Sequence, residues 1–174
     1  NGIKTDPETG LVFSPAHFTW MDTDHPAGTP RQGYPIEIQA LWHAALRVLG
    51  RIDQSERQDQ WHWLARKVKA SIFNLFWQND RGYLSDCRHA RIGQSALEAT
   101  PDDALRPNQL FAITLGAVAD KSVCESIVTA CEELLVPGAI RSLADRPVRR
   151  PLPVYHNNTL LNDPNAPYQG KYAG

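Results

Sequence analysis

Prolines and glycines divide the chain into a central part that can form long helices and two ends that cannot. Proline removes a backbone N–H donor and clashes with the preceding helical turn, so a segment rich in proline does not form a long helix. Most of the 13 prolines lie within residues 1–35 and 144–174: Pro7, Pro15, Pro26, Pro30, Pro35, Pro147, Pro151, Pro153, Pro164 and Pro167. We therefore predict loops over residues 1–35, with a short strand at 11–13, and no packed element over residues 144–174.

The central part has the apolar spacing of four helices arranged as two consecutive antiparallel hairpins. Apolar residues recur every three or four positions over residues 36–49, 55–77, 108–118 and from about 120 to 135. In the first helix we expect an inward stripe of Ile38, Leu41, Trp42, Ala45 and Leu49, and in the second one of Trp61, Leu64, Val68, Ile72 and Phe76. We predict loop over residues 88–104 and short extended pieces at 83–84 and 140–143. The predicted fold class is all-α.

Composition excludes several classes of protein. The 174 residues carry a formal net charge of −1, which disfavours nucleic-acid binding through bulk charge. No run of 18 apolar residues predicts a membrane span. The three cysteines are an odd number and do not suggest a disulfide framework, and no signal-peptide pattern opens the chain, so we expect a cytoplasmic protein. No spacing of histidine and cysteine predicts a metal site.

Three sequence blocks, in order along the chain, resemble the amylo-α-1,6-glucosidase domain of glycogen debranching enzymes. They are Thr19–Asp22, Thr29–Trp42 and Arg106–Ala112, with weaker agreement at Gly82–Leu84, Asp102–Asp103, Gly138–Leu143 and Tyr168–Gly174. The resemblance implies part of an (α/α)6 toroid, the six-hairpin glycosidase fold. On this basis residues 1–174 would be a partial domain, with an active-site loop region at 1–35, two hairpins at 36–143 and a proline-rich loop at 144–174.

The same resemblance implies a glycoside hydrolase. Members of this family release α-1,6-linked glucose from branched α-glucan, such as glycogen or limit dextrin, with inversion and without a cofactor. Inversion requires a protonated acid and a second carboxylate that activates water, roughly 6.5–9.5 Å apart. The resemblance assigns the acid to Asp22 and places the base in helices that follow this segment, so we expect the 174 residues alone to be inactive. Without the resemblance, Asp22 would be interpreted as a solvated loop or capping residue.

Further residues of these blocks are candidates for substrate binding. Trp20 has a ring suited to stacking on a pyranose face, and Arg31 has a planar fork that can hold a carboxylate or hydroxyls. Glu37 either accepts hydrogen bonds from glucose or complements the helix dipole. Asn108 and Gln109 either recognise hydroxyls or bond neighbouring loop backbone.

Other functions remain open from the sequence. Another glycosidase of the same superfamily, trehalase-like or glucoamylase-like, would use similar residues. A non-catalytic glucan-binding or scaffold protein would keep the aromatic and polar groups without the chemistry. Apolar helix faces left exposed by a partial domain would favour self-association.

Overall fold

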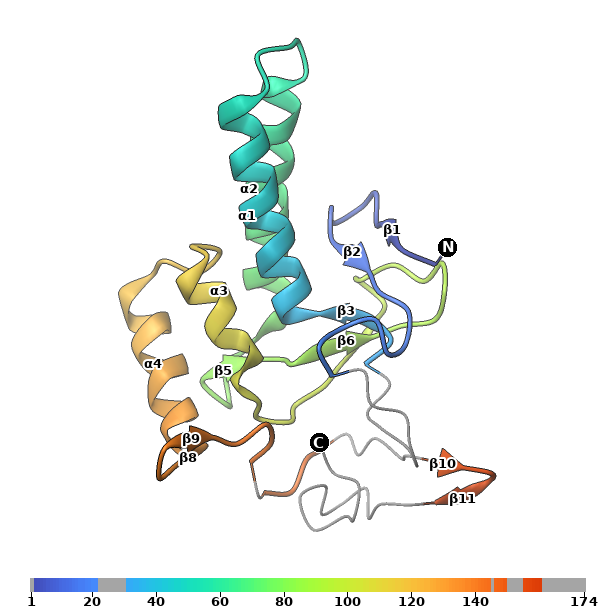
Figure 1. Cartoon of the computed structure of the whole chain (residues 1–174), viewed down its shortest axis with the longest axis vertical. Helices are drawn as coiled ribbons and strands as arrows, with labels where there is room; N and C mark the ends of the chain where they lie inside the picture. Colours follow the sequence, from blue (N-terminus) through green and yellow to red (C-terminus); the bar gives the residue numbers. More distant parts are fainter. Residues whose placement is uncertain (1, 22–30, 145, 150–154, 161–174) are drawn as a thin grey trace.

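The computed structural model describes residues 2–21, 31–144, 146–149 and 155–160 (Figure 1). Its helices are α1 (Ile36–Ile52), α2 (Gln58–Phe76), α3 (Leu110–Thr114) and α4 (Lys121–Glu132), with a 3-10 turn η1 (Pro107–Gln109) before α3. Its strands are β1 (Lys4–Thr5), β2 (Val12–Phe13), β3 (Gly33–Pro35), β4 (Trp77–Gln78), β5 (Tyr83–Leu84), β6 (Cys87–His89), β7 (Thr100–Pro101), β8 (Leu135–Val136), β9 (Ala139–Ile140), β10 (Tyr155–His156) and β11 (Thr159–Leu160). No helix among the described residues is long and apolar enough to cross a membrane.

The prediction of an all-α fold class is wrong. Helix makes up 39% of the structure and strand 16%, with the strands paired in several small antiparallel sheets. The strands are two or three residues long. A two-residue strand is too short to show the alternating apolar pattern by which sequence reveals a strand, so the periodicity of the helices dominated the prediction.

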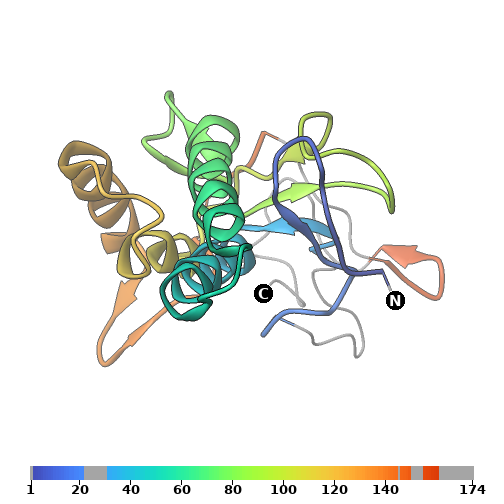
Figure 2. The same cartoon turned by 90° about the horizontal axis from the view of Figure 1, so that it is seen from above.

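The hairpin of α1 and α2 is the longest feature of the molecule and projects beyond the rest (Figure 1). Viewed from above, α3 and α4 lie on one side of this hairpin and the sheets of β1–β2 and β3–β6 on the other (Figure 2). The predicted inward face of α2 is confirmed for Val68, Ile72 and Phe76, which have no exposed surface. Helix α2 begins at Gln58 rather than at residue 55, because Asp53 instead accepts hydrogen bonds from the backbone of Ser55 and the Trp61 ring.

The predicted inward face of α1 is wrong. Leu41 of that stripe is 47% exposed, whereas the face packed in the core holds Ile36, Ala40 and Leu46 together with polar residues. Polar side chains are buried at low cost when their hydrogen bonds are satisfied. Gln39, for example, accepts from the backbone N–H of Val12 at 2.8 Å and donates to its carbonyl at 2.9 Å.

The three-stranded sheet β3–β6–β7 joins the start of α1 to the segment that precedes η1. Strand β6 pairs antiparallel with β3, placing Gly33 opposite His89, and with β7 on its other side. Gly33 has a φ of 128°, and a Cβ there would lie 2.2 Å from the Arg88 carbonyl oxygen, so only glycine permits this approach. The prediction of an unbroken loop over residues 88–104 is therefore wrong at both ends of that segment.

Candidate substrate site

Arg31 lies just before β3 and is buried against the first turn of α1. Its Nη1 and Nη2 donate to the two carboxylate oxygens of Glu37 at 2.5 and 2.6 Å. Nη1 also donates to the Thr19 hydroxyl at 3.1 Å. Because Arg31 is only 1% exposed and Glu37 2%, this fork fixes both side chains in one orientation.

Asp86 completes the cluster from the other side. It accepts from Arg31 Nε at 2.8 Å and from Asn108 Nδ2 at 2.7 Å, and its carboxylate lies 3.6 Å from Arg106 Nε. Among the described residues, this cluster therefore contains two arginines, Arg31 and Arg106, and two carboxylates, Glu37 and Asp86, so their buried charges balance. Sequence reasoning missed Asp86, because it reaches Arg31 only through the pairing of β3 with β6.

Two carboxylates favour the charged form of the Arg31 guanidinium. Burial by itself disfavours the charged guanidinium, but the carboxylates of Asp86 and Glu37 outweigh burial and raise the pKa of Arg31. Arg31 therefore stays a cation near neutral pH. Both carboxylates of the cluster are ion-paired with this cation.

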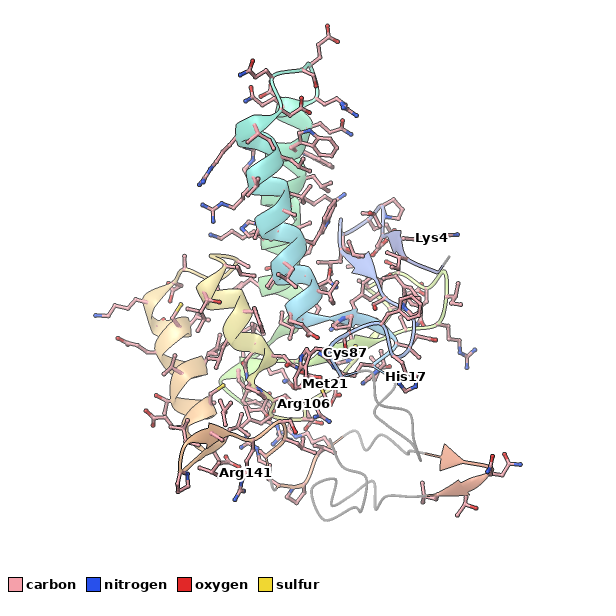
Figure 3. The ribbon with its side chains drawn as sticks, in the orientation of Figure 1. Lys4, His17, Met21, Cys87, Arg106 and Arg141 are labelled. Atoms are coloured by element: carbon pink, nitrogen blue, oxygen red, sulfur yellow. The ribbon has the colours of Figure 1, made fainter. Side chains whose placement is uncertain are left out.

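Trp20 and Asn108 connect the buried cluster to the surface. Trp20 Nε1 donates to Asn108 Oδ1 at 3.0 Å, while Asn108 Nδ2 also lies 3.5 Å from the Met21 sulfur. The Trp20 side chain is 57% exposed, so its ring is held by one hydrogen bond and is open to solvent on a large part of its surface. Figure 3 labels Met21, Cys87 and Arg106, which mark this region beneath the N-terminal end of α1.

A pocket of about 720 Å³ opens over these residues. This volume is within the range of small-molecule sites. Its polar lining residues are Glu37, Asn108 and Ser142. The other lining residues are Trp20, Ile38, Leu41, Pro107, Leu110, Phe111 and Ile140. The pocket thus combines a few fixed polar groups with an aromatic and aliphatic wall.

The structure brings together four of the predicted site residues and separates one. Trp20, Arg31, Glu37 and Asn108 are linked in one network, in which Arg31 lies behind the pocket wall. Gln109 does not line the pocket: its Oε1 accepts from the backbone of Leu84 at 2.9 Å and its Nε2 donates to the backbone of Arg106 at 3.1 Å. These two bonds anchor η1 to β5.

Two other expectations concern the acid and metals. Asp22, assigned as the general acid, lies outside the described residues. Within the described ranges, no group of three or more His, Cys, Asp or Glu side chains is arranged to hold a metal ion.

Comparison with known proteins now identifies the family. The family model for amylo-alpha-1,6-glucosidase matches residues 1–172, which is nearly the whole chain. A search of curated proteins gave no match. The sequence blocks that carry the resemblance include Trp20, Arg31, Glu37 and Asn108 of the network described above. The chain belongs to the amylo-alpha-1,6-glucosidase family.

Proposed function

We propose that this chain forms the glucose-recognising part of a glucosidase that releases α-1,6-linked glucose from branched α-glucan with inversion. The single observation that carries the proposal is the pocket over Trp20, Glu37 and Asn108. A glucose unit has apolar C–H faces and a rim of hydroxyls. An exposed tryptophan ring beside fixed carboxylate and amide groups is complementary to both.

Each pocket residue has a distinct role in the proposed recognition. The Trp20 ring stacks on the sugar, and its bond to Asn108 holds it in place. Glu37 accepts hydrogen bonds from glucose hydroxyls, using lone pairs that Arg31 leaves available, since each carboxylate oxygen can accept more than one bond. Because Arg31 already fixes Glu37, little conformational entropy is lost on binding.

We further propose that Asp22 is the general acid of the complete enzyme. The block Thr19–Asp22 that carries the family resemblance contains this aspartate, and its neighbour Met21 lies beside Asn108 of the pocket lining. The base is proposed to come from outside the described residues, because Glu37 and Asp86 are both engaged by Arg31.

The test is glucose release from panose and from phosphorylase limit dextrin, followed by NMR of the first anomer formed. The proposal predicts β-glucose from the complete enzyme and loss of most activity in Asp22→Asn. The same variant should still bind panose. Retention of most glucose release by Asp22→Asn would exclude the acid assignment, and release of α-glucose would exclude inversion.

A second candidate is glucan binding without catalysis by this chain. The observation that favours it is the engagement of both described site carboxylates in ion pairs. Calorimetry with panose and maltotetraose, combined with an assay of glucose release, separates the two candidates. A binding module is supported if the chain binds these glucans and glucose is released neither by the chain nor by a full-length enzyme that contains it. Preference for trehalose over panose would instead indicate the trehalase-like alternative.

We also propose that a second copy of the chain covers α1. Val48 and Ile52 are 51% and 66% exposed and share one face of the helix, away from the buried Leu46 and Gly50. Covering exposed apolar side chains of this kind removes apolar surface from water, which favours association. Sedimentation should show a dimer that dissociates in Val48→Asp, and a monomer at micromolar concentration would contradict this.

A further inference from the structure

The Asp102 carboxylate joins the central sheet to the segment that leads into η1. One oxygen, Oδ2, lies 3.1 Å from His89 Nε2 on β6. The other oxygen, Oδ1, accepts a hydrogen bond of 2.9 Å from the backbone N–H of Ala104. A single buried carboxylate therefore fixes where residues 102–104 leave the sheet.

The same segment supplies two groups of the candidate site. Arg106 and Asn108 follow Ala104 within a few residues, and both approach Asp86. Asp86 is itself adjacent to β6, and its backbone N–H donates to the Asp102 carbonyl at 3.3 Å. The contacts thus form a closed ring that runs from β6 through Asp102 to Asn108 and back through Asp86.

The contacts of His89 favour its charged form. Burial disfavours that form, while the hydrogen bond to the Asp102 carboxylate and the negative charge of that carboxylate favour it, so the pKa of His89 lies above its usual value of 6.5. Burial likewise opposes ionisation of Asp102, but the hydrogen bond from His89 and the charge of Arg106 lower its pKa below 3.8. Among the described residues, the titratable groups that act on His89 are Asp102, directly after β7, and the Cys87 thiol on its own strand. Arg106, before η1, acts on Asp102.

Nucleophilic chemistry by Cys87 does not explain this arrangement. Cys87 has no exposed surface, and its thiol donates to the Arg31 carbonyl oxygen at 3.7 Å. Burial raises the pKa of the Cys87 thiol, which keeps it protonated and unreactive. The His89–Asp102 pair is better explained by what it holds in place.

We propose that His89 is a positioning residue for glucan recognition. Through Asp102 it holds residues 102–109 where Asn108 can bond both Asp86 and the Trp20 ring. This rests on the proposed function, because the ligand recognised is the glucan of that pocket. Loss of the proton from His89 weakens its bond to Asp102, releases the Ala104 turn and lets Asn108 and Trp20 move.

The direction of the pH dependence follows from this chain of contacts. The imidazolium form is present below the raised pKa of His89, and there the pocket is ordered. Glucan affinity therefore falls as pH rises through that pKa. We expect a decrease of about three- to tenfold, the effect of weakening one or two buried hydrogen bonds.

The test uses the full 174-residue chain and panose as the probe. NMR of the histidine Cε1–H signals gives the pKa of His89, and calorimetry gives panose affinity against pH. Three variants complete the set: His89→Gln, Asp102→Asn and, as the matched control on α2, His62→Gln. His62→Gln should reproduce the wild-type step in affinity, whereas His89→Gln should bind more weakly at neutral pH and show no step.

Two readouts separate this proposal from the proposed function. The Asn108 side-chain amide signals should follow the His89 titration even without a ligand. If they do so but panose never binds, the glucan-binding function fails and the positioning stands for whatever the pocket recognises. If panose binds while its affinity and the Asn108 signals ignore the His89 titration, the positioning proposal fails alone.

Two further results would overturn the proposal. One is an unshifted His89 pKa. The other is an affinity step of unchanged midpoint in His89→Gln, which would assign the step to a different group. If a variant fails to fold by circular dichroism, the wild-type titration of Asn108 and of affinity decides the question.

Discussion

Removal of the Asp86 carboxylate tests whether the buried charge cluster holds the site together. In Asp86→Ala, Arg31 and Arg106 would face Glu37 as the one remaining carboxylate of the cluster, in a region where Arg31 is 1% exposed. Taking one partner from a buried ion pair costs about 3–5 kcal/mol, because a buried charge is left uncompensated. For a chain of this length, this corresponds to a decrease in Tm of roughly 6–20 °C.

The assay is urea unfolding monitored by circular dichroism, with the transition midpoint and slope fitted separately. The matched control is Glu125→Ala, which removes an exposed pair to Lys121 at 3.7 Å and should cost less than about 0.5 kcal/mol. Asp86→Asn should fall between the two, because the amide keeps an acceptor for Asn108 but loses the charge. A cost below about 1 kcal/mol for Asp86→Ala, with an unchanged slope, would refute the reasoning.

Three further predictions concern stability. The double variant Arg31→Met/Glu37→Met should unfold at a higher urea concentration than either single variant, because it removes one charge of each sign and leaves no unpaired charge. A double variant that unfolds at a lower urea concentration than both single variants would contradict the pairing. Gly33→Ala should cost more than about 2 kcal/mol because its Cβ meets backbone at 2.2 Å, whereas Gly138→Ala, which has open space, should cost about 1 kcal/mol; equal costs in urea unfolding would refute the packing argument. The neighbouring His89 holds the pKa of Asp102 below 3.8 despite burial, so the contribution of Asp102 to folding stability is complete above pH 3.8 and is lost as pH falls through the lowered pKa. In Asp102→Asn the free energy of unfolding should therefore depend less steeply on pH in the acid range, and an unchanged pH dependence in urea unfolding would count against this reasoning.

The helices were the most predictable part of the fold. The three- and four-residue spacing of Val68, Ile72 and Phe76 located α2 and its buried face, and Asp120 begins α4 by accepting from the Val123 backbone, as its position before the helix suggests. These features depend on residues close together in the sequence. Local pattern is sufficient for them.

Features that depend on distant segments were not predictable. The buried face of α1 includes Glu37, Gln39 and His43, which a pattern of apolar residues assigns to solvent. Each is buried because a distant group satisfies it: Arg31, the Val12 backbone and the Ala65 carbonyl respectively. Without the tertiary fold, no spacing rule identifies such partners.

The candidate site divides in the same way. The sequence blocks pointed to Trp20, Arg31, Glu37 and Asn108, which the structure places in one network. Asp86 and the His89–Asp102 pair came only from the structure, because the pairing of β3, β6 and β7 brings them to the site. Short strands of two or three residues carry too little pattern to reveal that pairing from sequence.

The central claim is that glucan binds at Trp20. The most direct measurement is 19F NMR of the chain labelled with 5-fluorotryptophan and titrated with panose, with the Trp20 signal assigned from Trp20→Phe. The account predicts that the Trp20 signal shifts and saturates, while that of Trp63, which is also exposed but lies on α2, stays in place. A Trp20 signal that does not move while panose binding saturates by calorimetry would contradict the account.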